Sequence, residues 1–172
     1  MPNTRRQRLS PQRAFTLVEI LIVVMILSIM AMIVMPRYSL ASDEARHTAL
    51  KDQLRVVREQ LVVFSAQHGG RWPGLTASGA VGAGDLFLRH LTQYSDGAGD
   101  TATRKDATHV FGPYLRMTPE NPISQMTTVK IDATIGTPAA DDSTGWIYQP
   151  RTGRLFVNST RQDPNGKDYI AY

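Results

Sequence analysis

The chain has 172 residues, enough for one modest domain, and it contains no cysteine, which excludes a disulfide framework and a thiolate metal site. Its formal net charge is +4, but four of its 19 basic residues lie among the first 14 residues, which contain no Asp or Glu. The remaining residues carry 15 basic and 15 acidic side chains, so the excess charge belongs to the N-terminal segment and we expect no nucleic-acid partner.

The first 36 residues combine a basic leader, residues 1–14, with a long apolar run. Between residues 15 and 35 only Thr16, Glu19 and Ser28 are polar. As a helix this run would be about 32 Å long, close to the roughly 30 Å of a bilayer's hydrocarbon core. We therefore expect residues 15–36 to form a single transmembrane segment, with the leader in the cytoplasm and the C-terminal part outside.

Residues 37–70 are predicted to continue the same helix as an amphipathic segment. Pro36 removes one helical hydrogen bond and predicts a kink rather than an end, because proline is tolerated in membrane helices. Gly69 and Gly70 are expected to end the helix. Apolar residues recur at spacings of three and four and share one face: Leu50, Leu54, Val57, Leu61 and Phe64.

Residues 71–172 are expected to form a globular domain. A short apolar patch predicts a helix over residues 85–94, and the rest of residues 71–106 reads as loop. Strands are predicted at residues 127–133, 145–149 and 154–158, the last two joined by a turn over 150–153, with a further strand at 169–171. The pattern indicates an α+β fold in which one long helix packs on a small antiparallel sheet.

Glu19 is the residue that a simple membrane anchor does not explain. A carboxylate within a membrane helix costs up to about 3 kcal/mol, so such a group is normally paired or functional. If the chain were cut before Phe15, a new α-amino group would appear, mostly charged at neutral pH. In a bundle of identical helices, this amine could pair with Glu19 of a neighbour and fix the axial stagger between copies.

Residues 13–24, Arg-Ala-Phe-Thr-Leu-Val-Glu-Ile-Leu-Ile-Val-Val, followed by Pro36, resemble the N-terminus of the type IV pilin family, which includes the type II secretion pseudopilins. The resemblance implies a pilin-like fold, cleavage between Ala14 and Phe15 by a prepilin peptidase that also methylates Phe15, and Glu19 as the assembly glutamate. The family usually has Gly before the cut. Here Ala14, the next smallest residue, stands in its place.

Three segments of the globular part add a second resemblance. Residues 112–115 (Gly-Pro-Tyr-Leu), 119–122 (Pro-Glu-Asn-Pro) and 145–148 (Gly-Trp-Ile-Tyr), followed by Thr152-Gly153, resemble major pseudopilins in their order and spacing. This implies a type II secretion pseudopilin, with a type IV pilus subunit as the alternative. The implied partners are other copies and related pilins, an assembly platform in the inner membrane, and the bilayer. The implied location is the inner membrane and then a periplasmic or extracellular fibre.

Two acidic segments are candidates for a cation site. Asp163, Asn165 and Asp168 form an Asp-x-Asn-Gly-x-Asp pattern, and Asp141 and Asp142 precede a predicted strand. The first pattern lacks the closing Glu of an EF-hand loop, so we expect a plain turn with no cofactor and keep calcium as the alternative.

No catalytic arrangement emerges from the sequence, and its four histidines, His47, His68, His90 and His109, are scattered. We therefore expect a structural subunit and not an enzyme. A single-pass anchored binding domain that never polymerises remains the alternative of another class.

Overall fold

The computed structural model describes residues 15–172, except for the side chains of residues 33–41. The chain divides into two compact units, Met1–Ala41 and Ser42–Tyr172. Helix α1 runs from Leu17 to Gln67, as predicted, and it ends before Gly69 and Gly70, which both have positive φ angles. The kink predicted at Pro36 falls among residues 33–41, outside the described side chains, and stays a prediction.

In the first unit, every side chain from residue 15 to residue 32 is exposed. Within residues 15–32 and 42–172, the structure contains no helix with both the length and the apolar character needed to cross a membrane. The predicted transmembrane segment, residues 15–36, extends beyond this range.

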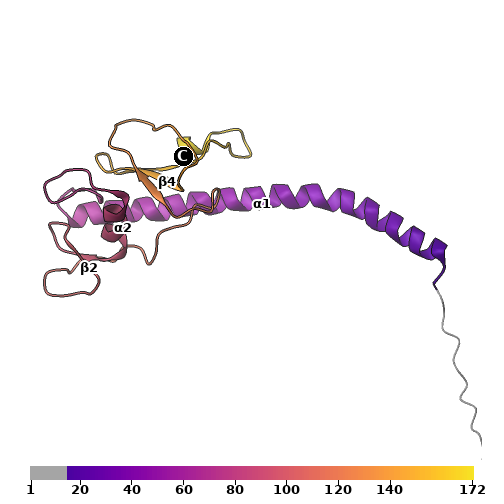
Figure 1. Cartoon of the computed structure of the whole chain (residues 1–172), viewed down its shortest axis with the longest axis horizontal. Coiled ribbons are helices and arrows are strands. Elements are labelled where there is room, and N and C mark those ends of the chain that lie inside the picture. Colours follow the sequence, from indigo (N-terminus) through magenta and orange to yellow (C-terminus); the bar gives the residue numbers. More distant parts are fainter. Residues whose placement is uncertain (1–14) are drawn as a thin grey trace, which may run out of the picture. The chain divides into compact units, whose positions relative to one another are not determined.

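In the second unit, the predicted apolar face of α1 is buried. Its five residues are at most 2% exposed, and burial of each such side chain contributes about 1.5–3 kcal/mol. Helix α2 (Gly84–Thr92) and the strands cover this face, with Phe87 of α2 and Trp146 and Tyr148 of strand β4 (Trp146–Gln149) in the same core. Figure 1 shows these elements along the second half of α1. The fold class is α+β, as predicted.

The main sheet differs from the prediction in one respect, because it is mixed and not antiparallel. Strands β4 and β5 (Arg154–Val157) form the predicted antiparallel hairpin, whose turn contains Gly153 at φ 68°. Strand β3 (Val129–Ile131), however, pairs with β4 in parallel. A parallel pair needs a connection of about a dozen residues or more, and residues 132–145 provide it.

Two smaller elements also depart from the prediction. Strands β1 (Tyr94–Ser95) and β2 (Thr101–Ala102) pair antiparallel, β1 at the end of the helix predicted over 85–94, which stops at Thr92, and β2 in the predicted loop. The strand predicted at residues 169–171 is wrong, because Tyr169–Ala171 forms the 3-10 helix η1. The chain turns there, and the Tyr172 hydroxyl reaches Asp163.

Arg58 of α1 connects the helix to the end of the domain. Its Nη2 donates to the Leu155 carbonyl at 2.9 Å and to the main-chain oxygen of Tyr172 at 2.7 Å. Burial lowers the pKa of this guanidinium, and the like charge of Arg154 lowers it further.

Three of the four histidines, His47, His68 and His90, are buried. The His90 Nδ1 accepts the Gly74 N–H at 3.0 Å, so its Nε2 carries the hydrogen and donates to the Gly99 carbonyl at 2.9 Å. Burial, which the Gly99 hydrogen bond only partly opposes, lowers the pKa of His90 to about 4. Neutral His90 therefore holds the loops on either side of α2.

The lowered pKa of His90 predicts a loss of stability in weak acid. In the unfolded chain this imidazole titrates near 6.5, so the unfolded chain binds the proton first as the pH falls. The free energy of unfolding therefore keeps its full value above about pH 6.5. Between about pH 6.5 and 4 it falls by up to about 3 kcal/mol because of His90. Urea unfolding of the full-length protein in detergent micelles, followed by tryptophan fluorescence at several pH values, measures this loss.

The variant His90→Gln should lose most of this pH dependence, because its amide can keep both hydrogen bonds without titrating. His109→Gln is the matched control. His109 bonds to the Asp106 carboxylate, which raises its pKa, so its substitution should leave the decline between pH 6.5 and 4 in place. An unchanged decline in His90→Gln would contradict the assignment.

Candidate functional site

The start of helix α1 is capped by the side chain of Thr16. The Thr16 Oγ1 accepts the backbone N–H of Glu19 at 3.2 Å, and the Thr16 carbonyl accepts the N–H of Ile20 at 3.3 Å. A threonine that accepts from the residue three positions later is an N-cap, and the Thr-x-x-Glu pattern is the signature of a capping box. Sequence reasoning assigned no role to Thr16, although this pattern could have indicated one.

Glu19 lies in the first helical turn, where its charge is favourable to the helix dipole. Residues 15–32 contain no Lys, Arg or His, so no basic side chain of this stretch can neutralise the carboxylate. Its counter-charge must come from another part of the chain or from another molecule.

The surroundings of Glu19 are apolar on every side of the helix. Phe15 is 74% exposed and Leu17 is 84% exposed, and the other large apolar residues up to Met32 are between 47% and 79% exposed. An isolated helix that is apolar all round is not stable in water and needs a bilayer or a bundle of other helices around it. Among the predicted site residues, Phe15 and Glu19 are therefore four positions apart on a surface that must be covered, whereas Ala14 lies outside the described residues.

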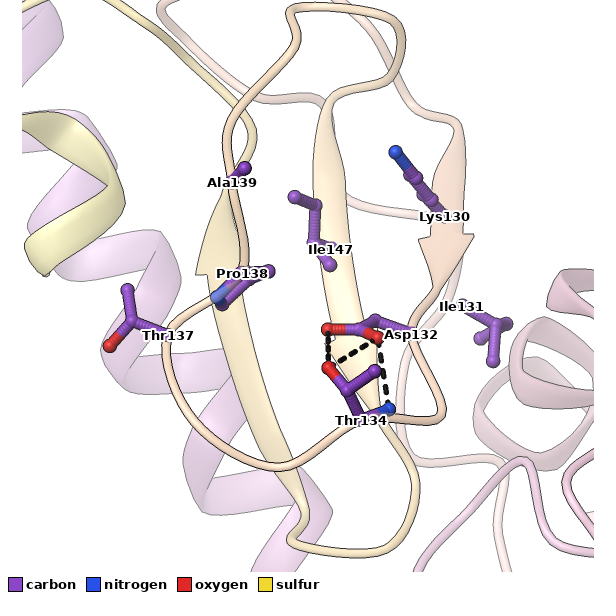
Figure 2. A pocket seen from close by; sticks show the side chains of 8 residues that line it. All are labelled: Lys130, Ile131, Asp132, Thr134, Thr137, Pro138, Ala139 and Ile147. Carbon is purple, nitrogen blue, oxygen red and sulfur yellow. Dashed lines mark hydrogen bonds between the residues drawn. The ribbon is translucent and has the colours of Figure 1, made fainter.

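A second feature is a surface hollow of about 350 Å³ beside β3 and β4. Figure 2 shows Pro138 and Ala139 of the connecting loop beside Ile147 of β4. The charged groups of the hollow are engaged within the protein: the Asp132 carboxylate accepts from Thr134 and Gln149, and Lys130 pairs with Asp141 at 2.6 Å. We assign no ligand to this hollow.

Asp141 and Asp142 each bind neighbouring groups of the protein. The Asp141 carboxylate accepts from Lys130, Ser143 and Asn158, and these hydrogen bonds lower its pKa, with that of Lys130 first. The Asp142 carboxylate accepts from the Thr160 backbone N–H and hydroxyl. In the structure these two residues hold the loop before β4 to the segment after β5.

Asp163 forms a turn with its own neighbours. Its Oδ1 accepts the N–H groups of Asn165 and Lys167, each at 2.8 Å, and its Oδ2 accepts the Tyr172 hydroxyl. These bonds, the one from Tyr172 first, lower the pKa of Asp163 to about 2 and raise that of Tyr172 to about 12. The Asp168 carboxylate accepts from the Gln162 amide instead, at 2.9 Å. Among the residues that the structure describes, no three acidic or histidine side chains gather as metal ligands would.

The long N-terminal helix and the small sheets define a pilin-like α+β subunit. Residues 9–35 match the family model described as the prokaryotic N-terminal methylation motif, and this match supports a type IV pilin-like prepilin. No curated protein and no solved structure matches the chain. The motif indicates a structural subunit that a prepilin peptidase processes, first held at a membrane and then built into a fibre.

The contacts of Asp163 predict that replacing this residue by Asn destabilises the domain more than the same replacement at Asp168. Asp163→Asn replaces an acceptor of three hydrogen bonds and should lower the midpoint of urea unfolding. Asp168→Asn, which can still bind Gln162, should leave the midpoint nearly unchanged. A rise of the midpoint on adding Ca²⁺ to the unmodified protein, but not to Asp163→Asn, would show instead that the turn binds the ion.

Proposed function

We propose that this prepilin is cut between Ala14 and Phe15, methylated at Phe15 and polymerised through residues 15–36 into a pilus-like fibre of the type II secretion kind. One observation carries the proposal. Glu19 lies on a helix surface that is apolar all round, in a stretch without a basic residue. A monomer in water offers neither cover for the surface nor a counter-charge for the acid.

Cleavage would supply the missing cation. Hydrolysis before Phe15 produces an α-amino group that is mostly charged at neutral pH and stays charged when it is methylated. Within one chain, Phe15 and Glu19 lie at the same helix end. Between chains, the amine of one copy can meet the carboxylate of the next when the two helices are staggered. Such a pair offsets the desolvation of both groups and selects one axial stagger.

Before assembly, the uncut and the newly cut subunit are proposed to be inserted in the bilayer. The apolar composition of residues 15–35 and the four arginines before it support a single-pass insertion with the globular unit outside the cytoplasm. The assembly platform then lifts the subunit into the fibre, where the helices form the shared core.

The preference for a secretion pseudopilin over a pilus subunit is supported by the globular segments. Gly145 precedes strand β4, which contains Trp146, Ile147 and Tyr148 and forms one arm of the hairpin. Trp146 and Tyr148 are among the most buried residues of the domain. The same segments resemble major pseudopilins in order and spacing. A fibre that forms only together with a protein-secretion machinery would agree with this preference.

The substitution Glu19→Gln tests polymerisation. It keeps the shape of the side chain and removes its charge, so fibre yield should fall on the order of tenfold or more while the amount of protein in the membrane fraction stays the same. Glu44→Gln is the matched control, because Glu44 is an exposed carboxylate on the same helix but in the second unit. Fibres are sheared, pelleted and quantified against the membrane fraction.

Mass spectrometry of the assembled protein provides the second measurement. Chains in fibres should begin at methylated Phe15. Fibres made of chains that still begin at Met1, or fibres that form normally from Glu19→Gln, would overturn the proposal. A protein that stays membrane-bound and never assembles under any condition would support the anchored binding domain instead.

A further inference from the structure

The helix begins just after the proposed cleavage site. Phe15 and Thr16 both precede α1, whose first residue is Leu17, and Phe15 is largely exposed. The two residues on the C-terminal side of the proposed cut therefore have non-helical backbone, and the Thr16 cap marks the boundary.

We infer that Thr16 is a positioning residue for the processing step: its cap keeps Phe15, the residue that follows the cut, out of the helix, in the form that the peptidase can bind. This inference rests on the proposed cleavage before Phe15. The inference adds that the peptidase requires a non-helical backbone at Phe15, which the residues of the methylation motif alone do not specify.

The hydrogen bond of the cap competes directly with helix extension. The Glu19 N–H that donates to Thr16 Oγ1 is the group that would bond to the Phe15 carbonyl if the helix started one residue earlier. While Thr16 holds this N–H, Phe15 is not drawn into the helical ladder.

The sequence offers another helix start further upstream. Ser10 is a good N-cap residue, and Pro11 after it suits the first helical position. Gln12, Arg13 and Ala14 are all good helix formers. Without the cap at Thr16, we expect the helix to extend toward Ser10 and to enclose the bond before Phe15.

Enclosure in a helix should slow hydrolysis. The reaction adds one water across the peptide bond, breaks the C–N bond, and leaves a carboxylate on residue 14 and the amine on Phe15. In a helix the backbone groups flanking this bond are engaged in hydrogen bonds, so cleavage must wait for local opening. Loss of an N-cap is worth about 1 kcal/mol, which corresponds to roughly a fivefold change in the open fraction.

The test compares full-length Thr16→Val, Thr16→Ser and Thr16→Asn in membranes that contain a prepilin peptidase. Val has nearly the shape of Thr but cannot cap, whereas Ser and Asn differ in shape and cap well. The rate of cleavage before Phe15, measured by mass spectrometry over time, should fall about fivefold in Thr16→Val and stay within about twofold of the unmodified rate in the other two. Amide hydrogen exchange at Phe15 in detergent micelles should slow in Thr16→Val alone.

Two results would overturn the inference. Cleavage of Thr16→Val at the unmodified rate would show that the cap has no part in processing. Slow cleavage of Thr16→Asn together with normal cleavage of Thr16→Val would show that the enzyme recognises the shape of this side chain. Failure of the unmodified chain to be cut before Phe15 is a different outcome, which removes the proposed function itself.

Discussion

Apolar surface on a helix has to be covered, and helix α1 presents two such surfaces of different form. From Ser42 onward the surface is a stripe on one side, and the chain covers it with its own sheet and with α2. From Leu17 to Met32 the surface runs all round, and no single small domain could enclose it. The first surface therefore leads to a folded domain, and the second one requires either lipid or other helices. The folded domain and the proposed role as a building block both follow from this difference.

In the proposed fibre, the carboxylate of Glu19 would select one arrangement among the many that could cover the apolar surface. Apolar packing alone is non-directional and would accept many relative positions of two helices. A single charge in an apolar surrounding accepts only positions that bring a counter-charge to it. In the proposed fibre, the helix would thus carry both the driving force for association and the group that limits association to one geometry.

The parts of the fold that depend on periodicity could be predicted from the sequence. The stripe from Leu50 to Phe64, the Gly69-Gly70 end and the hairpin around Gly153 all use local rules, and the structure has them where they were expected. The parallel pairing of β3 was missed because residues 132–145 have no regular pattern that would reveal their path across the sheet. The alternation of Tyr169–Ala171 is too short to separate a strand from a helical turn, and the structure has the turn, with the Tyr172 N–H bonded to the Tyr169 carbonyl. At the candidate site, the sequence predicts the apolar surroundings of Glu19. The cap at Thr16 follows only from the hydrogen bond between its Oγ1 and the Glu19 N–H in the structure.

The two bonds of Arg58 have a consequence for the order in which the chain folds. They connect positions 97 and 114 residues apart, so neither can form before the chain has been made as far as Leu155 or Tyr172, respectively. Contacts between such distant positions close late, because a long loop must first be ordered. With the leader held in the cytoplasm, a globular part that follows its helix across the membrane would thus make these contacts only once Leu155 and Tyr172 had followed.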